Sequence, residues 1–342
     1  MMKLGNSTEA RFSVVMLAFT LLLILMILVS MGLGRLYIAP LDVFKILCSG
    51  FIDFEQSWNE HAVSVIYTLR LPRVIAAVLI GAALALSGAA YQSVFKNPLV
   101  APDMLGVSTG ACVGASLCIL LGLGQSFVQL GAFFGGLLAV AFAVLIPRII
   151  GRNSIVMLVL SGLIVSGLMS SILGIIKYLA DSETQLPEIT YWQLGSLVSV
   201  SWENISSGIP ILACLLFMMV IRWRMNILTL SDEEVHMLGR DTGWLRYAII
   251  LCATVLTACS VCISGTIGWV GLVVPHFARM LIGPNNQRLL PLAIVLGALF
   301  LLVIDTISRT AMSAEIPLSI LTGLVGAPFY FYLLLRQRLA LS

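Results

Sequence analysis

Long apolar runs separated by short polar breaks dominate the sequence. The first run, residues 12–34, contains no charged side chain. A helix needs about 20 apolar residues to cross the hydrocarbon core of a bilayer, and this run is long enough. Nine comparable runs follow it. The pattern therefore predicts ten membrane-spanning helices, at residues 12–34, 72–92, 104–123, 128–147, 154–179, 205–221, 245–264, 267–282, 289–308 and 317–335.

Composition supports the same fold class. Hydrophobic residues make up 60% of the 342 residues and charged residues only 10%, whereas soluble proteins carry roughly 25% charged residues. So few charges cannot cover a water-facing surface. We therefore expect an all-α polytopic membrane protein, built as one transmembrane domain over residues 1–342, in contact with lipid and not with nucleic acid.

The basic residues indicate the orientation of the helices. Ten spans place both termini on one side, and that side carries 13 of the 19 Lys and Arg residues. Cytoplasmic loops of membrane proteins are enriched in Lys and Arg. We therefore expect both termini in the cytoplasm, with the chain crossing the membrane several times.

A polar break with two prolines, "KNPLVAPD", separates the second span from the third. Proline ends one helix and shapes the start of the next, so this break predicts a tight cytoplasmic turn. Small residues surround it and recur every four residues in the third span, as in helices that pack closely. The glycines that we expect to pack helices closely are Gly88, Gly106, Gly110 and Gly114.

Residues 106–110 also match the G-x-S-x-G pattern of a nucleophile elbow. That pattern indicates a hydrolase only on a strand–turn–helix with histidine and acid partners, and here it begins a membrane helix. An intramembrane hydrolase using Ser108 is kept as an alternative to helix packing. Cys259 and Cys262 lie within an apolar run without a second pair, so packing is favoured over a metal or redox role. We predict no catalytic residue, metal site or cofactor.

Two absences bear on whether this chain could itself use ATP or an ion gradient. No lysine ends a G-x-x-x-x-G-K motif, so the chain has no P-loop of its own. The predicted spans also lack a series of acids that could relay protons or hold sodium, which ion-driven carriers use. A secondary carrier is therefore disfavoured and is kept as a third alternative.

The polar loop after the sixth span contains a helix signal. Ser231 and Glu234 form a capping box, and Gly239 is placed to end the helix after Leu238. This predicts a short amphipathic helix on the cytoplasmic face, with Val235 and Leu238 available to a partner. An ordinary capped loop helix explains the residues equally well.

Five ordered motifs resemble the FecCD-like permeases of type II ABC importers for iron chelates, haem and vitamin B12. They are "LRLPRVIAAVLIGAALALSGAAYQ" (69–92), "NPLVAPDMLGVSTGA" (97–111), "LSDEEVHMLG" (230–239), "GTIGWVGLVVPHFAR" (265–279) and "EIPLSILTGLVGAPFYFYLL" (315–334). The resemblance implies ten helices, with spans two to five repeated in inverted orientation by spans seven to ten. It also implies location in the inner membrane of a bacterium and a second permease (an identical copy or a paralogue) that forms a central pathway with this one, close to the packing glycines. The other partners that it implies are two cytoplasmic ATPases and an external binding protein.

The resemblance gives roles to two groups of residues. The loop at about 222–244 would couple to the ATPase. Arg70, Arg73 and Arg309 would be docking charges for the binding protein, because complementary charge sets registry and association rate. The alternative is that these arginines extend to the membrane interface or pair with Asp305 and Glu315. The cargo that we expect is a ferric siderophore, with haem, vitamin B12 and molybdate-type oxyanions as alternatives.

Overall fold

The computed structural model describes residues 2–34, 36–49, 52, 58–151, 154–230, 232–237 and 243–341, and these residues form helices and connecting turns without a β-strand. Ten apolar helices match the ten predicted spans in number and order. They are α1 (Met2–Gly32), α4 (Leu71–Val94, continued from η1, Val65–Arg70), α5 (Val107–Leu120), α6 (Gln125–Ile150), α7 (Ile155–Leu179), α10 (Ile209–Ile221), α12 (Gly243–Ser264), α13 (Val270–Ile282), α14 (Asn286–Thr310) and α15 (Leu318–Leu341). Six are long and apolar enough to cross a membrane, and α5, α10 and α13 are shorter, with 13 or 14 residues; of α15, residues 318–332 form the apolar part.

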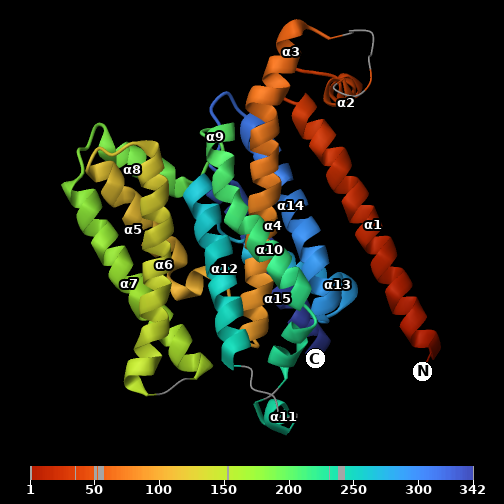
Figure 1. Cartoon of the computed structure of the whole chain (residues 1–342), viewed down its shortest axis with the longest axis vertical. Helices are drawn as coiled ribbons and strands as arrows, with labels where there is room; N and C mark the ends of the chain where they lie inside the picture. Colours follow the sequence, from red (N-terminus) through yellow and green to blue (C-terminus); the bar gives the residue numbers. More distant parts are fainter. Residues whose placement is uncertain are drawn as a thin grey trace.

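Both ends of the chain lie at the same end of the helical bundle (Figure 1). We call this the termini end and the opposite one the distal end. The short helix α11 (Asp232–Met237) lies at the termini end. The other short helices gather at the distal end: α2 (Pro40–Cys48), α3 (Glu60–Ser64), α8 (Gln185–Leu194) and α9 (Trp202–Ile205). The described part of the predicted loop at about 222–244 therefore lies on the same side as the termini.

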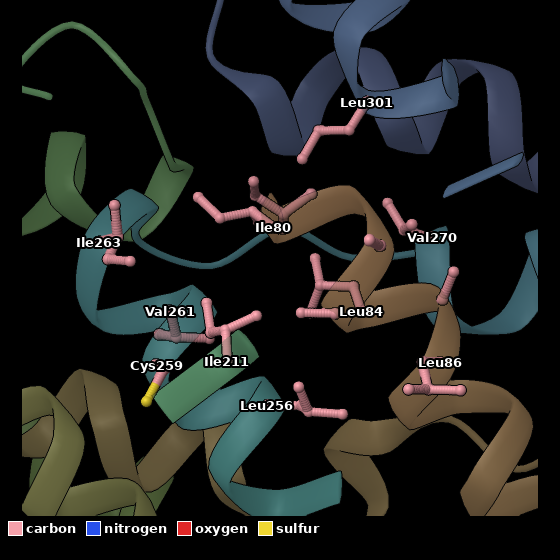
Figure 2. Packing of buried hydrophobic residues seen from close by; sticks show 14 of the residues in the cluster. Ile80, Leu84, Leu86, Ile211, Leu256, Cys259, Val261, Ile263, Val270 and Leu301 are labelled. Carbon is pink, nitrogen blue, oxygen red and sulfur yellow. The ribbon is translucent and has the colours of Figure 1, made fainter. Parts of the chain in front are cut away.

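Helix α4 forms the centre of the bundle. From Ile80 to Val94 every residue of α4 is buried, and α10, α12, α13 and α14 pack around it. Figure 2 shows apolar side chains from four of these helices in one cluster: Ile80 and Leu84 of α4, Ile211 of α10, Leu256 of α12 and Leu301 of α14. Many α4 residues are alanine or glycine, which lets neighbouring backbones approach closely.

The outer helices present apolar side chains outwards. On α6, Phe134, Leu138 and Phe142 are each at least half exposed, and they recur every four residues on one face. A wholly apolar exposed face is unfavourable in water and suits contact with lipid. This surface and the ten apolar helices make the chain a multi-pass membrane protein.

Two groups of four helices repeat with opposite direction. Helices α4, α5, α6 and α7 have lengths of 24, 14, 26 and 25 residues, and α12 to α15 have lengths of 22, 13, 25 and 24 residues. Helix α4 runs towards the termini end and α12 runs away from it (Figure 1). In both groups the second helix is the short one. This is the inverted repeat that the sequence resemblance implies.

The polar break after α4 is longer than a tight turn, and this corrects the sequence interpretation. The chain leaves α4 at Phe95, runs back into the bundle, and makes the single 3₁₀ turn η2 (Pro102–Leu105) before α5 begins at Val107. A Cβ added to Gly162, the eighth residue of α7, would lie 2.1 Å from the carbonyl oxygen of Met104. At 1.5 Å per residue, this places η2 about 10 Å inside the termini end of α7.

Candidate functional site

Three arginines and two carboxylates meet at the distal end of the bundle. We call this group the distal charge cluster, and it consists of Arg70, Arg73, Asp305, Arg309 and Glu315. Arg70 ends η1 and Arg73 lies in the first turn of α4, whereas Asp305 and Arg309 lie one turn apart near the end of α14. Glu315 lies in the loop before α15. The fold therefore brings together the three arginines that the sequence analysis singles out.

Arg73 donates hydrogen bonds to both carboxylates. Its Nε and Nη2 lie 3.0 and 2.9 Å from Oδ1 of Asp305. Its Nη1 and Nη2 lie 2.9 and 2.7 Å from the two oxygens of Glu315. The Asp305 side chain is fully buried, whereas that of Glu315 is 30% exposed. The planar guanidinium can satisfy two carboxylates at once, so Arg73 connects α4 to α14 and to the following loop.

Arg70 and Arg309 hold the distal end of α1. Arg70 donates to the carbonyl oxygens of Met31 and Gly32, and Arg309 donates to the carbonyl oxygen of Ser30. The last four carbonyl groups of a helix have no partner within the helix, and cationic side chains there also match the helix dipole. The two arginines therefore stabilise the end of α1. This role has no signal in the sequence, because nothing in the local pattern links residues so far apart.

An open cavity of about 310 Å³ lies against the distal charge cluster. All three arginines and Glu315 line it, together with Leu36 and Leu69. The Arg73 side chain is 14% exposed and that of Arg309 10%, so both are mostly buried where they line the cavity. Each arginine already has partners in this chain, which agrees with the pairing alternative. Docking of a binding protein here stays a prediction.

Helix α11 is the helix that the capping box predicts. It runs from Asp232 to Met237. Ser231, Leu238 and Gly239 lie outside the described residues. Glu234 is exposed, whereas Val235 is only 8% exposed and therefore packs on the chain itself. The apolar side chain that α11 does present is Met237, at 79% exposure.

The predicted packing glycines lie at close helix contacts. A Cβ on Gly88 would lie 1.8 Å from the carbonyl oxygen of Gly271 on α13. On α5, a Cβ on Gly110 or Gly114 would lie 2.4 or 1.9 Å from backbone oxygens of α6. Gly106 differs from these, because its φ of +81° places it in the left-handed region at the start of α5. Their position relative to a pathway stays a prediction.

Ser108 lies in the first turn of α5, after η2 and not after a strand. Its hydroxyl donates to the carboxylate of Asp103, and no histidine is among its hydrogen-bond partners in the described part of the chain. An acid that accepts directly from the serine leaves no place for the base that a hydrolase needs between them. The geometry therefore favours the packing interpretation over the intramembrane hydrolase.

Comparisons with known proteins agree with this architecture. The model of the FecCD transport family matches residues 22–336. The chain belongs to the FecCD transport family. It is 37% identical to the molybdate import system permease MolB of Haemophilus influenzae, over 95% of this chain and 96% of that one. It is 40% identical to an iron chelatin transport permease of Helicobacter pylori, over 80% and 83% of the two chains. It is also 36% identical to the hemin permease HmuU of Yersinia pestis, over 92% and 95%.

A solved structure shares the fold. It is described as an inward-facing metal-chelate type ABC transporter, and it matches with a TM-score of 0.84 at 36% identity, over 94% of this chain and 98% of that chain. The FecCD-family chain is therefore a permease of an ABC importer. Membership implies an ATPase and a substrate-binding protein as partners, with ATP hydrolysis in the ATPase chain.

Proposed function

We propose that this permease carries a ferric chelate across the membrane, by alternating access driven by ATP hydrolysis in a partner chain. The observation that carries the proposal is the range of cargo among its relatives: iron chelatin at 40% identity and hemin at 36%. Both are iron complexes far larger than a single ion. Molybdate is the second candidate, because the molybdate permease matches almost the whole chain at 37% identity.

Uptake by the reconstituted importer tests the proposal. The permease, its ATPase and its binding protein are placed in proteoliposomes, and ATP-dependent uptake of a ⁵⁵Fe-labelled siderophore is compared with that of ⁹⁹Mo-labelled molybdate. We expect iron uptake that requires both partners. Uptake of molybdate without iron uptake would refute the chelate assignment. Iron uptake without any ATPase would indicate the secondary-carrier alternative.

We propose further that α11, within the loop at about 222–244, is the element that docks into the ATPase. Helix α11 lies at the termini end (Figure 1), and the basic residues of the sequence predict that this end faces the cytoplasm. The ATPase must lie on that side, because its ATP is cytoplasmic. The exposed Met237 offers an apolar side chain to a groove, as in helix-in-groove recognition. The sequence places Leu238 beside it, outside the described residues.

Charge introduced into α11 tests the coupling role. Met237→Asp and Leu238→Asp should each abolish substrate-stimulated ATP hydrolysis and uptake, while the protein still reaches the membrane. Met237→Leu is the matched control, because it keeps an apolar side chain of similar volume. Normal uptake in both aspartate variants would show that the ATPase docks elsewhere.

We propose that the distal charge cluster receives the binding protein. The support is the convergence of three arginines on one cavity at the end of the bundle opposite α11. Acidic side chains on the binding protein would be complementary to these arginines, since such pairs speed association and set orientation. With α11 at one end and the cluster at the other, the two partners would meet opposite faces of the same bundle.

A further inference from the structure

The break between α4 and α5 places irregular backbone inside the membrane region. Met104 lies against Gly162, the eighth residue of α7. Pro102 lies against Gly271 in the first turn of α13: a Cβ added to Gly271 would be 2.7 Å from Cγ of Pro102. Two independent helices thus fix the depth of η2. Pro102 and Leu105 are buried between them, whereas Asp103 and Met104 are exposed.

Asp103 is therefore a residue at membrane depth that is exposed on its own chain. The Ser108 hydroxyl donates to it from the first turn of α5. No ion pair to Asp103 occurs among the described residues. Asp305 in the distal charge cluster differs, because its carboxylate is buried and two arginines compensate its charge.

Hydrocarbon does not tolerate such a surface. Irregular backbone at membrane depth occurs only where protein buries it or where it lines a water-filled cavity. Ionisable side chains at this depth face the bundle interior or such a cavity. Since Asp103 is exposed on its own chain, its exposed side must meet water or another protein chain. Exposed apolar faces, such as that of Leu138 on α6, are the surfaces suited to lipid.

We propose that Asp103, oriented by Ser108, faces a water-filled cavity inside the membrane and forms part of the wall of the cargo pathway. The inference that the water is the cargo pathway rests on the proposed transport function. A carboxylate in that wall attracts cations and repels anions. It therefore makes the pathway more favourable for a neutral or cationic chelate than for an oxyanion such as molybdate.

Thiol labelling tests access of water to this position. Asp103→Cys is made in the complete transporter, in a background where the half-buried Cys48, Cys118, Cys214 and Cys252 are alanine. Open membrane sheets are treated with a charged, membrane-impermeant thiosulfonate. Leu138→Cys is the matched control, because Leu138 is 56% exposed and lies close in depth to the start of α5, where Gly136 meets Val107.

We expect the cysteine at 103 to react at least tenfold faster than that at 138. N-ethylmaleimide, which crosses membranes, should react with the cysteine at 103 in the folded protein and with both cysteines after unfolding in SDS, because the thiolate is the reactive form and a thiol in hydrocarbon does not ionise. Failure of the charged reagent at 103, with reaction of N-ethylmaleimide, would overturn the proposal. A disulfide between two copies of Asp103→Cys under mild oxidant would instead place the residue in a contact between permeases and would also overturn it.

A second variant measures the charge effect while keeping Asp103. Ser108→Cys is labelled with a cationic and an anionic thiosulfonate, and the ratio of the two rates is divided by the ratio on a free thiol. With Asp103 present we expect a preference for the cation of about tenfold, and Asp103→Asn in the same chain should remove it. An unchanged ratio would show that the carboxylate does not act on the cavity. None of these measurements depends on uptake, so the site can stand where the assignment of cargo fails.

Discussion

Replacing Asp305 by alanine should destabilise the protein much more than replacing Glu315 by alanine. Both carboxylates bind Arg73, but Asp305 is fully buried and also lies 3.7 Å from Arg309 Nε, whereas Glu315 is 30% exposed. Removing one partner of a buried ion pair costs about 3–5 kcal/mol, because the remaining charge is left without compensation. Arg73 would keep Glu315, so we place Asp305→Ala near the lower limit, at about 3 kcal/mol. Solvent weakens the pair between Arg73 and Glu315, so Glu315→Ala should cost about 1 kcal/mol or less.

Unfolding of the purified permease in mixed micelles of rising SDS content measures this difference. The two single variants are compared with Arg73→Ala and with the Arg73→Ala/Asp305→Ala double variant, so that the cycle isolates the pair. We expect the double variant to be less destabilised than the sum of the single ones. Equal losses for Asp305→Ala and Glu315→Ala would refute the reasoning, since burial would then not decide the strength of the two interactions.

Three further outcomes follow from the contacts. Gly88→Ala should lower stability and assembly, because its Cβ would lie 1.8 Å from the Gly271 carbonyl oxygen, whereas Gly167→Ala meets no atom within 4 Å and should be neutral in the same unfolding assay. Ser87→Ala should cost about 1 kcal/mol, because the buried hydroxyl bonds the Ala253 carbonyl at 2.9 Å. Arg70→Glu should slow association of the binding protein and flatten its salt dependence in stopped-flow measurements. An unchanged on-rate would favour the purely structural role in holding α1.

The sequence predicts the number, order and alternation of the spans well, because each needs a long uninterrupted apolar run. It does not predict that the second helix of each repeat is short. The extended segments before α5 and α13 contain residues such as Val100 and Ile267 that are as apolar as the helices themselves. The left-handed Gly106 that starts α5 can be anticipated from its residue type. The left-handed Trp269 before α13, with φ +70°, cannot, because bulky residues rarely adopt that conformation.

Some contacts of the candidate sites have a local signal in the sequence, and others have none. The spacing of Asp305 and Arg309 by four residues gives a local signal for their pairing, and the capping box gives one for α11. The bonds from Arg70 and Arg309 to the end of α1 have no such signal, because they join residues on separate helices. The burial of Val235 also depends on packing that the capping pattern does not specify. In both cases tertiary structure, which one helix does not encode, decides what the side chain contacts.

The pairing of the arginines and their proposed docking role are physically compatible. Arg73 is held from inside by the fully buried Asp305 and from outside by Glu315, which is 30% exposed. Asp305 fixes the direction of the guanidinium, so little side-chain entropy remains to be lost when a partner binds. Glu315 lies in a loop between α14 and α15 and interacts across partly wet surface, where an ion pair contributes little. A carboxylate from a docked protein could therefore replace Glu315 on Arg73 at small cost. The replacement would release the loop at the start of α15, and α15 runs from there to the termini end, where α11 lies.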